Sequence, residues 1–328
     1  MIAVDQLRRT FQSKTGPVEA VRGVSFAVAA GEIVGFLGPN GAGKTTTQRM
    51  LSTLLTPTGG NATVAGCDLR KDPVGVRRKI GYVPQGGSTN PLASIVEELR
   101  TQAALHRVPR ADAEARIDEL LLSLDLQGLG ARLPQTLSGG QRRRLDIALG
   151  LIHRPKLIFL DEPSTGLDPH SRANLWNHIR HLRDHDGATI VLTTHYLDEA
   201  DALSDRILIM DHGQIVAEGS PQQLKRRISG DVVTFDVKDH QDAAKAVLGA
   251  LAGVRDLSIV DSTVRAVVDQ GSVDALPLMR ALDAAGIPVA AMTVTQPSLD
   301  DVFLTLTGRS LRDSDTAASS AAAAPGAN

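Results

Sequence analysis

With 328 residues, the chain is long enough for two domains or for one large domain with an appendage. A formal net charge of −2 argues against a nucleic-acid-binding protein, which usually carries a strong basic excess, and the single cysteine, Cys67, excludes an intrachain disulfide framework. No apolar run reaches the roughly 18 residues that cross a bilayer, and the first residues lack the apolar core of a signal peptide, so we expect a soluble cytosolic protein.

The first part of the chain predicts short strands, a glycine-rich turn and helices. Residues 1–35 read as short strands separated by turns. The turn GPNGAGKTT then precedes a helix that we expect to end near Pro57. This helix has an apolar stripe formed by Met50, Leu51, Leu54 and Leu55. Residues 92–130 read as helices interrupted at Pro109.

From about residue 155 the pattern changes to buried strands that alternate with helices. The strands are expected at KLIFL, ATIVLTT and RILIM. Such alternation is typical of a doubly wound α/β sheet. We therefore expect a first domain over residues 1–225, with a helical insertion at about 86–153.

A second, smaller domain is expected over residues 230–307. Its segments read as strand, helix, strand, strand, helix, strand, which is the order of a ferredoxin-like α+β domain. A short amphipathic segment, PSLDDVFLTLTG, follows the last strand. Residues 310–328 are small and polar and are predicted to be disordered.

The glycine-rich turn matches the pattern G-x-x-x-x-G-K-[ST] and lies between a buried strand and a helix, which is the context that this motif requires. Backbone N–H groups of such a loop wrap phosphates, Lys44 neutralises their charge, and Thr45 is suited to Mg²⁺. The candidate nucleotide-binding residues of this loop are Gly38, Pro39, Asn40, Gly41, Ala42, Gly43, Lys44, Thr45 and Thr46.

Polar residues at the ends of other strands are the candidates for the reaction itself. Asp161, at the end of the strand in LIFLDEP, is suited to a metal ion, and Glu162 is placed to accept a proton from an attacking water. His195 follows another buried strand at its carboxyl end, where we favour contact with a γ-phosphate. Gln85 follows a predicted strand and is a candidate for the metal or the water, so Thr45, Gln85 and Asp161 are the candidate metal ligands.

The segment LSGGQ begins another helix. Ser138 is a good N-cap, and Gly139 and Gly140 let the backbone approach a ligand closely. Together with Gln141 they form a candidate anion site at a helix N-terminus. On this segment alone, a plain helix cap is the alternative interpretation.

In their order along the chain, these motifs resemble those of the ATP-binding subunit of ABC transporters, over nearly all of residues 1–225. GPNGAGKTT resembles the Walker A motif, LSGGQ the signature motif and LIFLDEP the Walker B motif. Gln85 is similar to the Q-loop, STGLD (ending at Asp168) to the D-loop and His195 to the H-loop. Phe11 stands where the family places an aromatic residue that stacks on adenine, a position where tyrosine is commoner.

The resemblance implies an α/β P-loop NTPase core of the ABC ATPase type, with a β subdomain and a helical insertion, that hydrolyses ATP with Mg²⁺. In the family the signature motif of one chain closes over ATP held by another chain. A second ATPase chain, as a homodimer, and integral membrane permease subunits are therefore the implied partners, with no nucleic acid. The implied location is the cytoplasmic side of the cell membrane, as a peripheral subunit.

The C-terminal unit and PSLDDVFLTLTG resemble the C-terminal extension of the daunorubicin-resistance type of exporter ATPase. This resemblance implies export of a drug, an antibiotic or a lipid-like compound. An importer ATPase and a non-transport ABC ATPase of DNA repair or chromosome structure are the alternatives. The interval from Thr45 to Asp161 disfavours the second, because it holds a compact helical insertion and no long coiled coil.

Three further features have a structural interpretation. His178, His181 and His185 fall on one helical face, which we expect to be a solvated polar face rather than a metal site. The arginines 142–144 are expected to make salt bridges or to attract phosphate. Trp176 is expected to pack.

Overall fold

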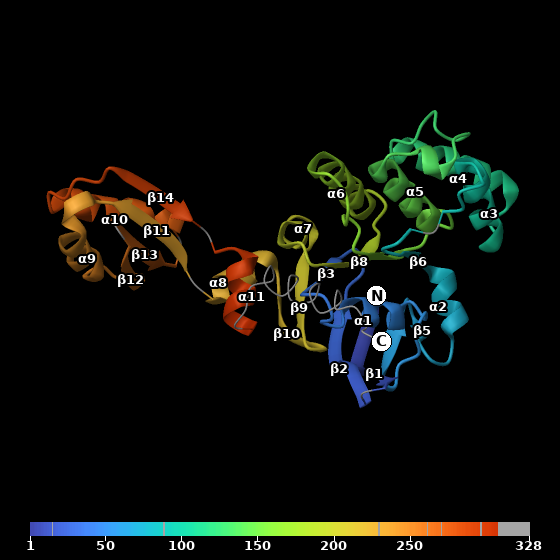
Figure 1. Ribbon diagram of the computed structural model, residues 1–328, viewed down its shortest axis with the longest axis horizontal. Coiled ribbons are helices and arrows are strands. Elements are labelled where there is room, and N and C mark those ends of the chain that lie inside the picture. The colour runs from blue at the N-terminus through green and yellow to red at the C-terminus, as the bar shows by residue number, and fades with distance from the viewer. Residues whose placement is uncertain are drawn as a thin grey trace, which may run out of the picture. The chain divides into compact units, whose positions relative to one another are not determined.

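The computed structural model describes residues 1–14, 16–87, 89–228, 230–260, 262–269, 271–295 and 297–307 (Figure 1). These residues divide into two compact units, one over Met1–Glu218 and the other beginning at Gly219. The sequence predicts the boundary at about residue 225, and the predicted disordered tail, 310–328, lies outside the described residues. None of the described helices is both long and apolar enough to span a bilayer.

A six-stranded sheet forms the centre of the first unit. Its order is β10-β9-β3-β8-β7-β6, and the five strands from β9 to β6 run parallel. Strands that are covered on both faces read as continuous hydrophobic runs, and β3, β7 and β8 are buried at every position. The strands are β3 (Ile33–Leu37), β6 (Ile80–Val83), β7 (Leu157–Asp161), β8 (Thr189–Thr194), β9 (Arg206–Asp211) and β10 (Gln214–Gly219).

A second, antiparallel sheet packs on this core. It has the order β2-β1-β4-β5, formed by β1 (Ile2–Ser13), β2 (Gly16–Val28), β4 (Gly59–Val64) and β5 (Cys67–Asp68). The inner side chains of this sheet share one hydrophobic cluster with the central sheet. Phe26 of β2, for example, meets Phe36 of β3 edge to face, with ring centroids 5.3 Å apart.

The helix after the glycine-rich turn, α1 (Lys44–Leu51), ends earlier than the sequence predicts. Met50 and Leu51 are buried as expected, but Leu54 lies beyond the helix and is 58% exposed. The cause is Thr53, which adopts the left-handed conformation (φ 64°) that terminates helices. The predicted apolar stripe therefore loses its last turn.

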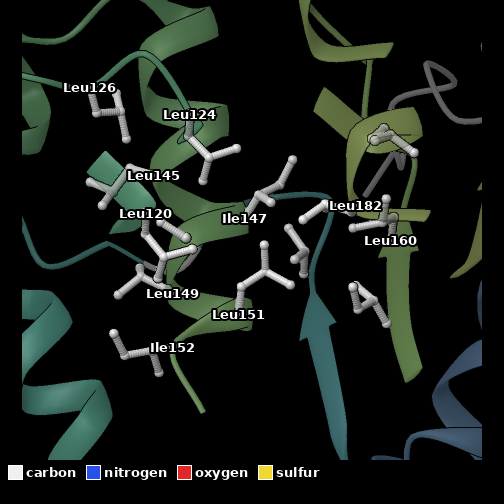
Figure 2. Close-up of a cluster of buried hydrophobic side chains, with 14 of the residues drawn as sticks. Leu120, Leu124, Leu126, Leu145, Ile147, Leu149, Leu151, Ile152, Leu160 and Leu182 are labelled. Atoms are coloured by element: carbon white, nitrogen blue, oxygen red, sulfur yellow. The ribbon is translucent and has the colours of Figure 1, made fainter. Parts of the chain in front are cut away.

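The helical part of the first unit is held together by α5, which is buried on almost all sides. Figure 2 shows Leu145 and Leu149 of this helix on the side of Leu120, whereas Ile147 and Leu151 point toward the central sheet. Every residue from Leu145 to Leu151 is buried, as is typical of a helix in a core position. The helices of this unit are α2 (Pro73–Lys79), α3 (Ile95–Leu105), α4 (Arg110–Ser123), α5 (Gly139–Leu151), α6 (Pro169–Asp184) and α7 (Leu197–Leu203), with a 3-10 turn at Pro134–Thr136.

The second unit has the strand and helix order that the sequence predicts. Its antiparallel sheet has the order β12-β13-β11-β14, and Phe235 and Leu248 lie in its core. The last strand begins at Ala291, later than expected, after Pro288. The elements are α8 (Pro221–Ile228), β11 (Asp231–Asp236), a 3-10 turn (Lys238–His240), α9 (Gln241–Gly249), β12 (Val254–Val260), β13 (Thr263–Val268), α10 (Gly271–Ala284), β14 (Ala291–Thr295) and α11 (Leu299–Thr307).

The apolar side of α11 is partly covered within the second unit. Val302 and Phe303 are fully buried, and the helix packs against α8. Leu304 and Leu306, on the same segment, remain 47% and 41% exposed.

We predict that Phe235→Ala destabilises the second unit by about 3–5 kcal/mol, because it leaves a cavity in a fully buried core. Met292→Ala is the matched control, since Met292 lies directly opposite Phe235 on β14 but is 43% exposed. Urea denaturation of both variants gives the comparison. Equal losses of unfolding free energy in the two variants would contradict the assignment of Phe235 to the core.

Candidate functional site

The glycine-rich loop between β3 and α1 is shaped by close backbone contacts. A Cβ on Gly38 would lie 2.2 Å from the carbonyl oxygen of Met210, and one on Gly43 would lie 2.5 Å from that of Ala20. Gly43 also has a φ of 100° at the start of α1. Only glycine fits these positions, which explains why the sequence motif requires it.

Lys44 is buried inside this loop. Its ammonium group donates hydrogen bonds to the carbonyl oxygens of Gly38 (2.6 Å) and Pro39 (2.9 Å), so that the loop curls around a positive charge. Of the other candidate residues, Asn40 and Gly41 are exposed, Ala42 is buried, and Thr45 and Thr46 are half-buried at the start of α1. A buried cation surrounded by a tight turn at a helix N-terminus is suited to phosphate.

Asp161, at the end of β7, is fully buried and is surrounded by hydroxyl groups. Its Oδ1 accepts hydrogen bonds from Thr45 (2.9 Å) and from Thr193 (2.7 Å), and its Oδ2 accepts one from Tyr82 (3.4 Å). The structure thus places the candidate metal ligands Thr45 and Asp161 side by side. A carboxylate next to a hydroxyl fits the oxygen ligands that Mg²⁺ prefers.

Glu162 brings the other reaction candidates together. Gln85 donates a hydrogen bond of 2.7 Å to Oε2 of Glu162, and Thr165 donates one of 3.1 Å to the same oxygen. The Nδ1 of His195 lies 3.4 Å from Oε1, an ion-pair distance without the alignment of a hydrogen bond. Of the three candidate metal ligands, Gln85 is thus the one that contacts the candidate base, Glu162, in this structure.

The backbone of Glu162 is unusual. Its φ of 45° lies in the left-handed region, which disfavours a residue with a side chain. The backbone N–H of Glu162 donates hydrogen bonds to the carbonyl oxygen (3.1 Å) and the hydroxyl oxygen (3.0 Å) of Thr193. These hydrogen bonds stabilise the conformation. Strain of this kind is found at functional sites, where the surrounding structure maintains it.

The pKa of Glu162 is below its ordinary value of 4.5. Burial alone raises the pKa, but the neighbouring His195, Lys44 and Thr165 favour the charged form and together outweigh burial. The carboxylate is therefore ionised at neutral pH, as a proton acceptor must be.

The signature segment and the D-loop lie next to each other in the same chain. Ser138 Oγ accepts a hydrogen bond from the amide of Gln141 (3.2 Å), and Gln141 Oε1 accepts one from the amide of Ser138 (3.0 Å), which together form a capping box on α5. Asp168 caps α6, because its Oδ1 accepts a hydrogen bond from the backbone amide of Ser171 (2.9 Å). A Cβ on Gly140 would lie 2.8 Å from Ser171 Oγ, so glycine is needed where the two helix starts meet.

The cap interpretation of Ser138 therefore describes the single chain correctly. In Figure 1, α5 and α6 lie side by side, whereas α1 lies on the other side of strands β8 and β6. The signature segment and the glycine-rich loop of one chain thus stand apart.

Arg143 is a residue whose place the sequence analysis missed. It is buried rather than on a charged surface, and it donates hydrogen bonds to the carbonyl oxygens of Pro84 (2.6 Å), Asp161 (2.9 Å) and Pro163 (2.9 Å). It thereby connects the segment before Gln85 to the strand that carries the two carboxylates. The signal was its spacing, because Arg143, Ile147 and Leu151 lie on one helical face.

Two of the three arginines make the predicted salt bridges, Arg143 with Asp146 (3.9 Å) and Arg144 with Asp125 (3.4 Å). Arg142 is exposed and donates a hydrogen bond to the carbonyl of Pro134 (3.3 Å). Trp176 does more than pack, because its indole N–H donates to Ser164 (3.0 Å) and to the buried Glu199 (3.3 Å).

Phe11 lies at the far end of β1 and is 36% exposed, with the guanidinium of Arg9 4.6 Å from its ring centroid. His178 contacts Asp125 at 3.2 Å, and His181 stacks on His185. Within the described ranges, no group of three or more His, Cys, Asp or Glu side chains is arranged to hold a metal ion.

Comparison with known proteins adds two family matches. The ABC transporter model matches residues 21–165, and the model of the C-terminal domain of DrrA1-3-like ATP-binding proteins matches residues 219–307. The daunorubicin/doxorubicin resistance ATP-binding protein DrrA of Streptomyces peucetius is 42% identical over 299 residues, which cover 90% of each chain. The linearmycin resistance ATP-binding protein LnrL of Bacillus subtilis is 33% identical over 95% of this chain and all of its own.

Solved structures agree with these matches. An ATP-binding cassette in a dimeric post-hydrolysis state, bound to ADP and Pi, is 26% identical and superposes with a TM-score of 0.61. The superposition covers 67% of this chain and 98% of that cassette. The predicted α/β core of the P-loop type is therefore confirmed.

We predict that Arg143→Met lowers the free energy of unfolding by several kcal/mol and slows nucleotide turnover, because three buried carbonyl groups lose their donor at about 1–3 kcal/mol each. Arg143→Lys keeps the positive charge but not the several donors of the guanidinium group. Its unfolding free energy and its turnover should therefore lie between those of the wild type and those of Arg143→Met. Arg142→Met is the control for the same chemical change on the exposed neighbour. Urea denaturation and turnover assays that fail to separate Arg143→Met from Arg142→Met would refute the role.

Proposed function

Because this chain belongs to the ATP-binding subunits of ABC transporters and carries a C-terminal domain of the DrrA type, we propose that its ATPase activity drives the export of a drug, antibiotic or lipid-like compound. The single observation that carries this proposal is the combination of the two matched domains in one chain. Relatives over nearly the whole length are resistance proteins against daunorubicin, doxorubicin and linearmycin. No observation on this chain favours the importer or the non-transport alternative.

The partners follow from the arrangement of the motifs. A homodimer at the cytoplasmic face of the membrane, bound to integral permease subunits and to no nucleic acid, is the assembly that we propose. Support comes from the single glycine-rich loop and the single signature segment, which lie apart in one chain, and from the dimeric state of a similar cassette.

In this proposal one chain of the homodimer binds ATP with its glycine-rich loop. Backbone N–H groups of residues 38–46 and the ammonium group of Lys44 bind the phosphates, and Phe11 stacks on the adenine. Thr45 and Asp161 would hold Mg²⁺, with Gln85 as a further candidate ligand, and the ion would supply positive charge near the phosphate oxygens. The existing hydrogen bond between Thr45 and Asp161 supports this pairing.

Glu162 is the proposed general base. Its ionised carboxylate accepts a proton from water, while Gln85 and His195, which already contact that carboxylate, orient the water and the γ-phosphate. The Ser138–Gln141 helix start of the second chain covers the γ-phosphate, with Asp168 of that chain beside it. Each site is then complete only when two chains meet.

Replacement of the proposed base gives the first test. Glu162→Gln should lower turnover by roughly 10²–10⁴-fold, because the proton acceptor is lost, and should retain ATP binding, because Lys44 and its loop are unchanged. Glu114→Gln on α4, which makes an exposed ion pair with Arg100, is the control and should leave both quantities unchanged. Glu162→Gln with nearly wild-type turnover would exclude Glu162 as the base.

The pH dependence of turnover follows from the same residue. Because the pKa of Glu162 is lowered, its carboxylate stays ionised from neutral pH down to pH 4.5, the ordinary pKa of a glutamate. The protonation of Glu162 should therefore cause no change in turnover over that range. Activity should fall only as the pH passes below that value, when the carboxylate becomes protonated.

The shared site gives a second test, in which two inactive variants are mixed. Lys44→Ala disables the glycine-rich loop and Ser138→Arg disables the signature segment. In the mixed dimer both defects fall in one composite site, so the other site is intact and partial ATPase activity should return. The proposal fails if heterodimers form, as shown by two different affinity tags, and the mixture remains inactive.

A further inference from the structure

Glu199, on α7, is a buried acid that the proposed reaction does not use. It is 0% exposed, and burial raises its pKa above the ordinary value of 4.5. The hydroxyl and indole donors around it, and the charge of Arg172, offset the burial only in part. A fully buried carboxyl group is costly for a fold, so its hydrogen bonds indicate what it holds in place.

The carboxyl group of Glu199 connects α7 to two other segments. Its Oε1 accepts hydrogen bonds from the hydroxyl of Ser164 and from the indole N–H of Trp176 (3.3 Å). The same indole N–H lies 3.0 Å from the hydroxyl oxygen of Ser164. Ser164 opens the segment STGLD and Trp176 lies on α6, which packs against α7 (Figure 1). One oxygen of Glu199 is therefore an acceptor for both the STGLD segment and α6.

Ser164 is the anchored neighbour of a residue that contacts the proposed base. Ser164 is fully buried, whereas Thr165, the next residue, is exposed. The hydroxyl of Thr165 nevertheless donates a hydrogen bond of 3.1 Å to Oε2 of Glu162. An exposed threonine has little packing of its own to hold it, so its position depends on its buried neighbour. Glu199 holds that neighbour through the Ser164 hydroxyl.

His195 lies at the other end of this connection. Glu199 follows His195 by four residues, on the helix that begins at Leu197. The Nδ1 of His195 lies 3.4 Å from Oε1 of Glu162. Glu199 therefore joins the two segments that contact the two carboxylate oxygens of Glu162, one through Thr165 and the other through His195.

A second link between α6 and α7 lies at the surface. Arg172 donates a hydrogen bond of 3.2 Å to Asp198, and its guanidinium lies 4.5 Å from the ring centroid of Tyr196. The side chain of Asp198 is 59% exposed, and exposed ion pairs of this kind contribute little to stability. The buried link through Glu199 is therefore the one on which the position of α7 mainly depends.

We propose that Glu199 is a positioning residue for ATP hydrolysis, which fixes Ser164 against α7 and thereby sets Thr165 and His195 on the two sides of Glu162. This inference rests on the proposed function, because it takes Glu162 to be the general base. A displacement of about 1 Å in a catalytic group can lower turnover by about 10²-fold. Glu199 thus acts on the reaction through other residues.

The test compares Glu199→Leu, which removes the acceptor, with Glu199→Gln, whose amide oxygen keeps it. Turnover at saturating ATP and ATP affinity are measured for the full chain. We expect Glu199→Leu to lower kcat by roughly 10- to 100-fold and to bind ATP like the wild type, because Lys44 and its loop are untouched. Glu199→Gln should retain most of the wild-type kcat. Asp201→Leu and Asp201→Asn, at an exposed position of the same helix, are the controls and should leave both quantities unchanged.

Trp176, the only tryptophan of the chain, reports directly on this network. Its emission spectrum should change in Glu199→Leu, because the indole N–H loses one of its two acceptors. The spectrum should stay close to that of the wild type in Glu199→Gln and in both Asp201 variants. An unchanged spectrum of Glu199→Leu would show that the contact is absent in solution and would overturn the inference.

Combined variants separate positioning from a general loss of structure. In Glu162→Gln no base is left to position, so the addition of Glu199→Leu should not lower the residual turnover further. Ser164→Ala removes the donor and should lower kcat as Glu199→Leu does, and the two changes together should be no worse than the more impaired single variant. Losses that multiply in either combination would make Glu199 a structural residue and overturn the inference.

The outcomes also separate this inference from the proposed function. Wild-type kcat in Glu199→Leu, with Glu162→Gln impaired, would overturn the inference alone. A loss of kcat as large in Glu199→Gln as in Glu199→Leu would also overturn it, because the acceptor oxygen would then have no role. A wild-type chain that does not hydrolyse ATP, or nearly wild-type turnover in Glu162→Gln, would instead refute the proposed function.

Discussion

Two adjacent carboxylates buried at the end of one strand impose the main constraint on the first unit. Asp161 is fully buried and Glu162 is 7% exposed, and burying such groups is costly unless hydrogen bonds and charges compensate them. The donors come from distant parts of the chain: Thr45 lies in the first turn of α1, Gln85 follows β6 and Thr193 is the last residue but one of β8. The parallel sheet brings these segments to one edge, so the sheet order and the glycine-rich loop serve the same pair of acids.

Most of this edge could be predicted from the sequence, because the residues follow buried strands whose carboxyl ends must meet. Arg143 could not be placed in the same way. Its three partners are backbone carbonyls, which have no sequence signature, and its neighbours in the RRR run are exposed or half-buried. Trp176 is similar, since its partner Glu199 becomes visible only when α6 and α7 are packed together. The burial and the hydrogen-bond partners of such residues depend on tertiary contacts rather than on local sequence patterns.

The end of α1 and the start of β14 show a different limit. Apolar spacing predicted that α1 includes Leu54, but the left-handed turn at Thr53 stops the helix, and nothing in the apolar pattern reports a residue's φ. In the second unit, Val289 and Ala290 continue the apolar pattern of β14 but precede its first ladder pair at Ala291. The period of the apolar residues therefore predicts where helices and strands lie, whereas the backbone conformation determines where they end.

The capping box at the start of α5 has a consequence for dimer formation. Ser138 and Gln141 hold each other's backbone amides in the isolated chain, so this segment is preorganised before any partner arrives. The conformational entropy of this segment is lost when the chain folds, so ordering it adds no further cost when two chains associate. A serine hydroxyl that accepts one hydrogen bond also retains its own proton for donation, so the cap and an incoming phosphate oxygen do not compete for it.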